Sequence, residues 1–453
     1  MNKRQMLKVI TLGLACTVAL GSVSYSQHVE ARKQNPGNHA KNVILMIGDG
    51  MGPTQVSAAA YMKRKGYGAG KLTMSRLQET GLATTYSHDS VVTDSSAAAT
   101  AFSSGYKTDN GVVGKAPKHK EHYEGERHDD VKTVLDDAQK KRKATGLVTT
   151  TRLTHATPAS FASHVEDRDS ENEIADQMMN HGVDVLLGGG KANFLPKKDG
   201  GKREDGKNLI QVAEKKGYTV VEDKESLKKA KSNKLLGLFN NSHLNYELDR
   251  ATSDEPSVAD MTRKALKTLS KDKNGFFLMV EGGRIDHAGH DNYPAANIRD
   301  TLAFDKAVRA ALNYAKKDPD TLVVVTADHE TGGMSMGANG TYVFNKEVID
   351  KVKRSSEFIG KEVDKDRSKV KEIMAKYAGI NDLKPEEEQS IQKAKDPASA
   401  VAKVISDRAN VGWTSTAHTA VNVPIFSQGP RADQLSGTID NTKIAKVISR
   451  AMK

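Results

Sequence analysis

The sequence has almost no cysteine, few aromatic residues and no long hydrophobic run, and each of these absences excludes a class of protein. Cys16 is the only cysteine among 453 residues, so no disulfide framework braces the fold. Aromatic residues make up only 5% of the chain, although its net charge is +11. Because the lysines are scattered among acids and stacking partners are few, we expect no specific nucleic-acid partner. The positive charge instead favours anionic substrates and contact with cell-wall polyanions.

No apolar stretch is long enough to be a stable membrane anchor. A short apolar stretch over about residues 9–20 follows three basic residues, and Val29-Glu30-Ala31 offers a small-residue cleavage site. These features predict a secretory signal peptide over residues 1–31. The remaining chain, 32–453, has no cysteine, and its charge falls from +11 to about +9 because three basic residues and Glu30 are removed. We therefore expect a secreted protein, either free or loosely held at the cell wall.

Short apolar runs that stop abruptly at polar residues indicate the fold class. Runs of this length without period-two alternation are typical of strands buried on both faces of a parallel sheet. The predicted fold is therefore α/β, with a mostly parallel central sheet covered by helices on both faces. The runs lie at residues 43–47, 147–150, 276–280 and 322–326.

Candidate metal ligands follow these runs. In open α/β sheets ligands bind at the carboxyl ends of the strands, so one shared site explains the polar residues more simply than separate loops do. Oxygen and nitrogen ligands without thiolate suit zinc or magnesium, and without a cation the carboxylates would repel one another. Asp286 and His290 stand at i and i+4, so one helical turn presents both to one ion. The candidates are Asp49, Glu281, Asp286, His287, His290, Asp328 and His329.

A serine stands where a turn gives way to an alanine-rich helix, in the stretch from Val91 to Ala101. Free N–H groups and the positive dipole end of that helix would stabilise an anion beside Ser95, and phosphate is the anion such sites most often hold. Thr93-Asp94-Ser95 is equally an ordinary N-cap signature. The motif alone leaves a nucleophile and a helix cap as alternatives, and the polar strand ends favour the nucleophile.

Together these residues resemble the alkaline phosphatase family. Seven separated motifs agree with the family in order and chemistry over about residues 42–430. They are Gly48-Asp49-Gly50-Met51-Gly52, Thr93-Asp94-Ser95-Ser96-Ala97, Ala156-Thr157-Pro158, Val280-Glu281-Gly282, Asp286 with His290, Thr326-Ala327-Asp328-His329, and His418-Thr419. The resemblance implies a hydrolase that releases inorganic phosphate from phosphate monoesters through a phosphoserine intermediate, at two Zn²⁺ ions and one Mg²⁺ ion.

The resemblance also implies a role for each residue. Ser95 resembles the nucleophile and would touch the second zinc, and Arg168 falls where the family has its phosphate-clamping arginine. The implied ligands are Asp286, His290 and His418 for the first zinc, Asp49, Asp328 and His329 for the second, and Thr157 and Glu281, with Asp49 as a bridging carboxylate, for the third metal.

Two positions depart from the best-known bacterial pattern of the family. Where that pattern has an aspartate and a lysine, this chain has His155 and His287, as the animal enzymes do. Imidazoles near Asp49 and Glu281 would favour Zn²⁺ or another transition ion at the third site. Equally, both histidines would only hydrogen-bond to metal-held water or to phosphate. They are therefore auxiliary candidates.

The proposed ligands span almost the whole chain, so residues 32–453 are expected to form one catalytic domain with insertions. One predicted insertion covers about residues 190–275. A second covers about 340–411, where residues 347–376 and 385–409 are predicted to form charged amphipathic helices.

Two other functions are compatible with these motifs. A phosphodiesterase of the same metal superfamily would need an uncharged or apolar platform for its second ester group, whereas a compact pocket with Arg168 favours small phosphate monoesters. A catalytically inactive phosphate-binding protein is disfavoured because the nucleophile and every inferred ligand are present. Because family members are usually dimers, a homodimer is an expectation of the resemblance alone.

Overall fold

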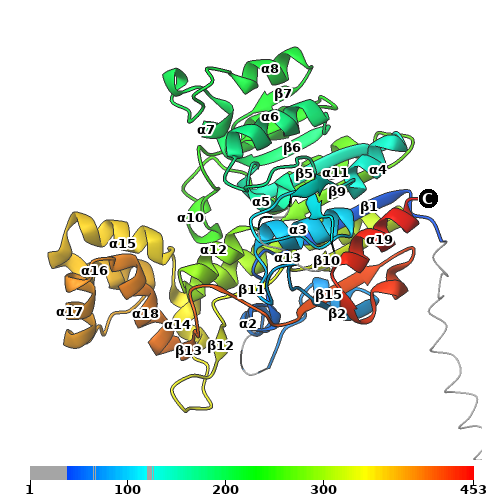
Figure 1. Cartoon of the computed structure of the whole chain (residues 1–453). Helices are drawn as coiled ribbons and strands as arrows, with labels where there is room; N and C mark the ends of the chain where they lie inside the picture. Colours follow the sequence, from blue (N-terminus) through cyan, green and yellow to red (C-terminus); the bar gives the residue numbers. More distant parts are fainter. Residues whose placement is uncertain (1–37, 65, 67, 120–124, 126) are drawn as a thin grey trace, which may run out of the picture. The chain divides into compact units, whose positions relative to one another are not determined.

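The computed structural model describes residues 38–453 except 65, 67, 120–124 and 126. The predicted signal peptide over residues 1–31 lies outside the described residues. A ten-stranded sheet forms the centre of the described chain (Figure 1). Its strands, in spatial order, are β16 (Gly437–Asp440), β2 (Glu79–Thr84), β15 (Val423–Gln428), β10 (Thr321–Thr326), β1 (Asn42–Ile47), β9 (Phe276–Glu281), β5 (Ala144–Arg152), β6 (Val185–Gly189), β8 (Leu235–Leu238) and β7 (Thr219–Val221).

The four apolar runs of the sequence form the adjacent strands β10, β1, β9 and β5. These strands are parallel, and within the described sheet only β15 runs antiparallel to its neighbours. Ile47 lies opposite both Thr326 and Glu281 in register, and Glu281 lies opposite Thr149. The carboxyl ends of the central strands are therefore level, and the segments that follow them meet at one edge of the sheet.

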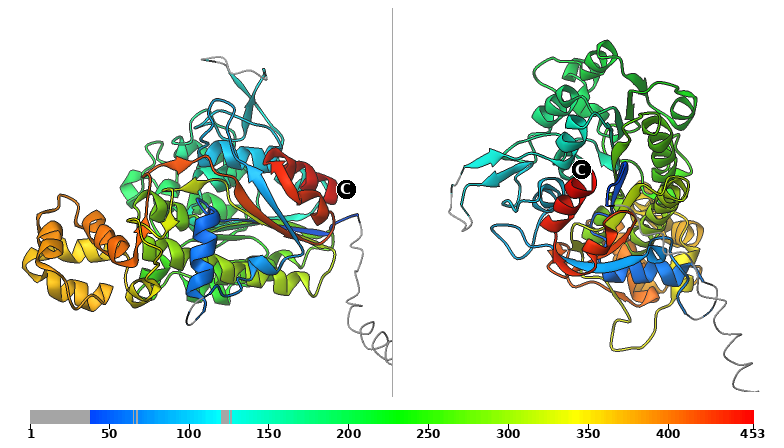
Figure 2. Two further views of the ribbon diagram at one scale, coloured as in Figure 1. Left: turned by 90° about the horizontal axis from the view of Figure 1, so that it is seen from below. Right: turned by 90° about the vertical axis from the view of Figure 1, so that its right-hand side faces the viewer.

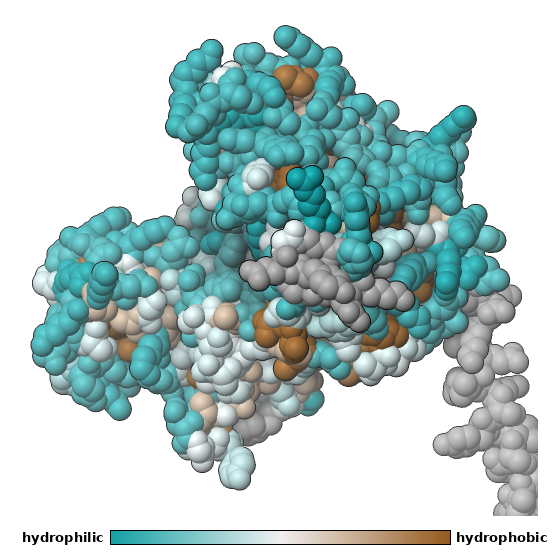
Figure 3. Space-filling model, in the orientation of Figure 1, coloured by the Kyte–Doolittle hydropathy of each residue, from teal (hydrophilic) through white to brown (hydrophobic). Residues whose placement is uncertain are grey.

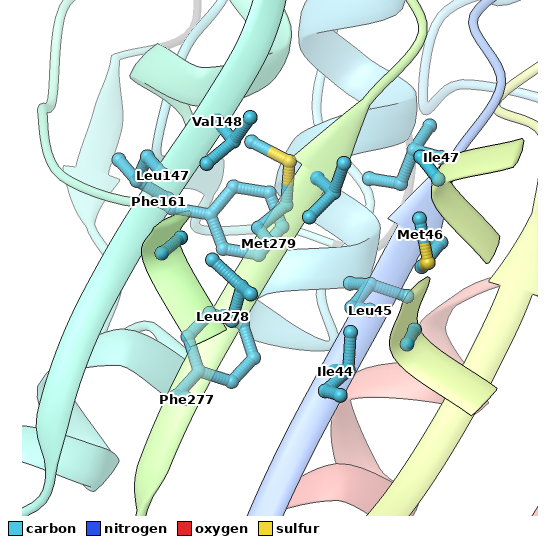
Figure 4. Packing of buried hydrophobic residues seen from close by; sticks show 14 of the residues in the cluster. Ile44, Leu45, Met46, Ile47, Leu147, Val148, Phe161, Phe277, Leu278 and Met279 are labelled. Atoms are coloured by element: carbon cyan, nitrogen blue, oxygen red, sulfur yellow. The ribbon is translucent and has the colours of Figure 1, made fainter. Parts of the chain in front are cut away.

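Helices cover both faces of this sheet, so the predicted fold class is confirmed (Figures 1 and 2). Strands β1, β9 and β10 are buried at every residue, which explains their continuous apolar sequences. Figure 4 shows Leu147, Phe161 and Phe277 near one another in this core, and Ile44 on the neighbouring strand β1. The main covering helices are α11 (Val258–Leu269) and α13 (Pro294–Ala315) on one face and α3 (Ser95–Ser104), α4 (Val134–Lys140) and α19 (Thr442–Ala451) on the other.

The stretch 190–275 extends the sheet at one edge. It supplies β8 and β7, together with α8 (Leu209–Lys215), α9 (Lys224–Lys229) and α10 (Glu247–Arg250). Strand β8 pairs in parallel with β6. These residues therefore continue the central sheet as well as carrying helices and loops.

The stretch 340–411 is helical, with short helices where the sequence predicts two long ones. Its apolar side chains, among them Ile359, Ile391 and Val401, form a second core cluster that also takes in Ala58 and Ile298, and its surface is mostly hydrophilic (Figure 3). A new helix begins after the cap residue Ser355, and another begins at Pro397, which occupies its first turn. The helices are α14 (Lys346–Lys351), α15 (Ser356–Lys365), α16 (Val370–Ile373), α17 (Pro385–Lys393) and α18 (Pro397–Ala409).

The longest of the described helices, α13, has 22 residues and carries charges along its length. In the part of the chain that the structure describes, no helix combines the length and the apolar character needed to cross a bilayer.

Candidate metal centre

The predicted ligands converge at the level carboxyl ends of the central strands. Asp49 follows β1, Glu281 ends β9, and Asp328 and His329 follow β10. The helix α12 (Arg284–His290) begins shortly after β9 and carries Asp286 and His290. A two-residue strand, β14 (His418–Thr419), pairs with β11 (Glu330–Thr331) and so brings His418 to the same edge.

Three sets of side chains bring their ligand atoms within 4.8 Å of one another. The first group joins Asp286, His329 and His418, the second joins Asp49, Asp328 and His329, and the third joins Asp49, His155 and Glu281. Asp49 and His329 are each shared between two groups. Such clustering of carboxylates and imidazoles fits divalent cations better than an uncharged ligand.

The imidazoles of His290 and His418 face each other through the same ring nitrogen. Their Nε2 atoms are 3.0 Å apart, whereas their Nδ1 atoms lie 2.7 Å from the Thr416 carbonyl and 2.8 Å from the Thr93 carbonyl. Each carbonyl accepts from an Nδ1–H, which leaves the Nε2 lone pair for a metal.

Asp286 lies 3.4 Å from His290 Nε2 and 3.5 Å from His418 Nε2. Without a metal, a hydrogen bond from His290 to this carboxylate is the main cause that raises the pKa of His290 to about 9. A divalent ion between these three side chains would take the place of that proton. The geometry therefore suits the predicted first metal.

Ser95 lies beside the second group. Its Oγ is 3.2 Å from His329 Nε2, and it is the first residue of α3. Oxygen atoms of Asp328 and Asp49 lie 3.2 and 3.5 Å from the same His329 nitrogen. Burial, and then the neighbouring Asp328 carboxylate, raise the pKa of Asp49 well above its usual range. A cation in this group would relieve both effects and lie within reach of the serine oxygen.

The third group contains polar atoms without partners. Both oxygens of Asp49, Oε1 of Glu281, Oγ1 of Thr157 and Nδ1 of His155 are buried and have no hydrogen-bond partner. Burial raises the pKa of Glu281 to about 7, and burial, then Arg168, lower the pKa of His155. Unsatisfied buried donors and acceptors are rare in folded proteins, and a bound cation accounts for this set together.

Arg168 is fixed by the cap of α3. Its NH1 donates to Asp94 Oδ2 at 2.8 Å, and its NH2 lies 3.3 Å from His155 Nε2. Asp94 also accepts from the backbone N–H of Ala97, so one carboxylate caps the helix and holds the arginine. The guanidinium therefore lies beside Asp94, the residue before the serine, and its role as a phosphate clamp stays a prediction.

Both auxiliary histidines lie near the third group, but only His155 belongs to it. The His155 and His287 ring centroids are 5.7 Å apart. Burial, followed by Arg284, lowers the pKa of His287 to about 3, and Arg284 NH1 lies 2.9 Å from His287 Nδ1. His287 is thus a neutral neighbour of the centre.

Sequence reasoning missed residues that orient the ligands. Thr149 and Thr151 donate to Glu281 Oε2, and Thr331 donates to Asp286 Oδ1 at 2.5 Å. The sequence offered only a run of three threonines, 149–151, at the end of β5, and that run does not say which strand they face. His243 was also missed: its ring lies 4.3 Å from that of His287, and no motif marked its loop.

Comparison with known proteins decides the family. The model of the family described as alkaline phosphatase matches residues 40–453. The chain belongs to the alkaline phosphatase family. It is 42% identical to alkaline phosphatase 3 of Bacillus subtilis, over 96% of this chain and 94% of that protein, and 38% identical to alkaline phosphatase 4 of the same organism, over 99% and 95%.

Solved alkaline phosphatases share the fold. The enzyme of Thermus thermophilus is 33% identical with a TM-score of 0.82, over 94% of this chain and 95% of that chain. The cold-active enzyme of Shewanella sp. is also 33% identical, with a TM-score of 0.81, over 91% and 100%. These relatives confirm the predicted family and enzyme class: the chain is an alkaline phosphatase, which hydrolyses phosphate monoesters and has residue groups suited to divalent metal ions.

Proposed function

We propose that this alkaline phosphatase works through a phosphoserine on Ser95, beside two Zn²⁺ ions and a third divalent ion. The observation that carries the proposal is the position of Ser95 Oγ, 3.2 Å from a histidine shared by two ligand groups. Arg168 lies beside the same helix start. A nucleophile, two cation sites and an anion clamp are the parts that phosphoryl transfer by positioning and electrostatics requires.

The reaction has two displacements. In the first, Ser95 Oγ forms a bond to phosphorus while the ester P–O bond breaks and the alcohol leaves with a proton. In the second, water forms a bond to phosphorus, the Ser95 oxygen leaves and regains a proton, and inorganic phosphate is released. Arg168 holds two equatorial oxygens in both steps through a planar fork that lysine cannot reproduce.

The proposed ligands of the metals follow the family resemblance, which has His290 where the first group has His329. Asp286, His290 and His418 would hold the first zinc, and Asp49, Asp328 and His329, with Ser95, the second. When bound, such a pair of ions neutralises the attacking and leaving oxygens and lowers the pKa of a bound water.

The third site would use Glu281, Thr157 and Asp49. The place of His155 in this group supports Zn²⁺ or another transition ion there in preference to Mg²⁺. His155→Asp should shift the preference of the third site towards Mg²⁺, which prefers oxygen ligands. Metal analysis after dialysis against both ions measures this shift, and an unchanged metal content would remove His155 from the site.

Turnover of a chromogenic phosphate monoester and the matching diester by residues 32–453, loaded with zinc and magnesium at alkaline pH, tests the function. We expect a large preference for the monoester. A preference for the diester would mean that the ligand groups are right but the pocket around Arg168 accommodates a second ester group.

The assignment of the first zinc is tested by His418→Ala. We expect this variant to lose one zinc per chain while the other sites keep their metal, because the remaining groups retain their ligands. Mass spectrometry of the native protein counts the bound ions. His39→Ala, an exposed histidine near the start of the described chain, is the control, and a full metal complement in both variants would contradict the assignment.

We also propose secretion, phosphate scavenging as the biological role, loose association with cell-wall polyanions, and a homodimer. The signal-like residues 1–31 and the charge of +11 support the first and third of these. N-terminal sequencing of protein from the culture medium and sedimentation of the holoenzyme test the signal peptide and the dimer.

A further inference from the structure

A cavity of about 620 Å³ opens beside His290, one of the proposed ligands of the first zinc. Its walls come from the end of α12, the loop before α14, one side of α18 and the segment that precedes β14. Its volume lies within the range of sites that bind small molecules. The residues on which the argument rests are His290, Asn339, Ser399, Lys403, Trp413 and Thr416.

The cavity lies on the side where the leaving group must depart. In the proposed function Ser95 and His329 belong to the second zinc, and in-line transfer places the leaving oxygen opposite the attacking serine oxygen. The first zinc, which His290 would help to hold, is therefore the one that faces the leaving oxygen. The His290 side chain is 38% exposed, so the alcohol attached to that oxygen can extend past this ring into the cavity.

One wall of the cavity is tied rigidly to the metal centre. Trp413 lies on the same segment as Thr416, whose carbonyl holds His290 at 2.7 Å, and as His418. The backbone of Gly332 accepts from Thr414 N at 3.0 Å and donates to the Ala417 carbonyl at 2.9 Å. A Cβ at Gly332 would lie 2.7 Å from the indole ring. The tryptophan is therefore held at a fixed position relative to the ligands.

The chemistry of the lining indicates an aromatic ligand with hydroxyl groups. The indole Nε1 donates to Ser406 Oγ at 3.1 Å, so the nitrogen is satisfied and the ring offers an apolar surface to the cavity. The Asn339 amide, the Ser399 hydroxyl and the Lys403 ammonium lie around it, and Asp407, which pairs with Lys403, and Asp291 add carboxylates that can accept from hydroxyl groups. An indole stacks on any heterocyclic base, while amide and hydroxyl groups bind sugar hydroxyls.

We propose that this cavity binds the nucleoside part of nucleoside monophosphates, with the base against Trp413 and the phosphate at the metal centre. The inference rests on the proposed function, because it needs the leaving oxygen at the first zinc. It adds a preference for one kind of alcohol in the substrate, which the metal-ligand groups alone would not produce.

The fluorescence of Trp413, the only tryptophan in the chain, reports binding without turnover. Titration of the metal-loaded protein with adenosine, excited where adenine does not absorb, should give saturable quenching, and glycerol should give none. Ser399→Tyr places a ring in the cavity from an exposed position on α18 and keeps the reporter. We expect it to abolish the quenching. Quenching that is absent in the wild type, or undiminished in Ser399→Tyr, would overturn the proposal.

Kinetics separate this inference from the function on which it rests. The wild type should turn over adenosine monophosphate with a kcat/KM about tenfold above that of glycerol 2-phosphate, and Ser399→Tyr should bring the ratio close to one. Trp413→Phe should retain part of the preference. Lys365→Gln, on α15 away from the cavity, is the control and should keep the wild-type ratio.

Equal turnover of the two substrates by the wild type would contradict nucleoside binding in the cavity but would not affect the proposed phosphatase function. Turnover of neither substrate, with adenosine quenching preserved, would overturn the proposed function instead.

Discussion

Two fully buried aspartates show how differently this fold treats a negative charge. Asp305, on α13, accepts from Lys63 Nζ at 2.6 Å, from the backbone N–H groups of Thr73 and Met74 at 2.6 and 3.0 Å, and from Thr73 Oγ1 at 3.1 Å. Asp49, at the end of β1, has no hydrogen-bond partner at either oxygen. His329 Nε2 lies 3.5 Å from one of these oxygens.

The difference separates a structural acid from a ligand. A buried carboxylate is costly unless donors or a counter-ion satisfy it, and Asp305 receives both from protein groups. Around Asp49 the neighbours are further acids, including Asp328, Glu281 and Asp286, and these carboxylates raise its pKa in addition to burial. Folding therefore leaves the metal edge, meaning the three ligand groups at the carboxyl ends of the strands, incomplete until cations bind. The α13 site, meaning Asp305 with its donors, is complete without a cation.

The largest effect is expected for Ser95, the proposed nucleophile. Ser95→Ala should lower kcat by at least about 10³-fold, because the proposed phosphoserine can no longer form. Steady-state turnover and native mass spectrometry measure activity and metal content, and the variant should still bind metal and phosphate. Ser104→Ala, at the other end of the same helix, removes a bond to the Thr100 carbonyl and one from the Tyr106 backbone N–H and serves as the control. Comparable turnover of both variants would remove Ser95 from its role.

A smaller loss is expected at the anion clamp. Arg168→Ala should slow catalysis by about 10²-fold and weaken competitive inhibition by phosphate, since a charge-assisted bidentate contact is lost. Arg168→Lys should restore charge but not the fork, and so recover only part of the affinity. Inhibition constants for phosphate in the three proteins test this order. If both variants were inhibited like the wild type, another group would make the clamp.

The sequence predicted the metal edge better than it predicted the rest. Asp49, Glu281 and Asp328 each follow a continuous apolar strand, and parallel strands bring such ends together whatever the helices do. His418 lies far along the chain on a two-residue strand, and only the family resemblance reached it.

The orienting residues escaped for a physical reason. Thr149 contacts Glu281 across neighbouring strands, and His243 comes from a loop after β8, so their roles depend on strand order, which local patterns do not contain. The helices after residue 346 were predicted too long because charge periodicity continues across Ser355 and Pro397, where new helices begin.

Removal of metal should make the stability of the protein depend on pH, because the buried carboxylates of the ligand groups are then left without a cation. The pKa of Glu281 in the folded chain is about 7 against an ordinary 4.5, so its contribution is fully present below about pH 4.5 and is lost as the pH rises through 7. The loss is on the order of 3 kcal/mol. Thermal unfolding of the chelated protein between pH 5 and 8 measures it.

Glu281→Gln isolates this contribution. Without metal, the wild type should lose stability relative to the variant as the pH rises, because glutamine cannot ionise. With metal the order should reverse, because the wild type gains from its cation. Parallel pH profiles for the two chelated proteins would show that Glu281 does not titrate in this range.

The smallest effect on catalysis is expected for Asp305, the buried aspartate on α13. Asp305→Asn should lower the free energy of unfolding by about 2 kcal/mol. The Lys63 charge loses its partner, and the new asparagine NH2 group faces donors that need an acceptor. Denaturant unfolding measures this cost. Turnover per folded, metal-loaded molecule should stay within about twofold of the wild type, since the site lies outside the ligand groups. The decrease in stability on chelation should also match that of the wild type. A larger decrease in Asp305→Asn would mean that the two buried acids are coupled through α13, and that the α13 site supports the metal edge after all.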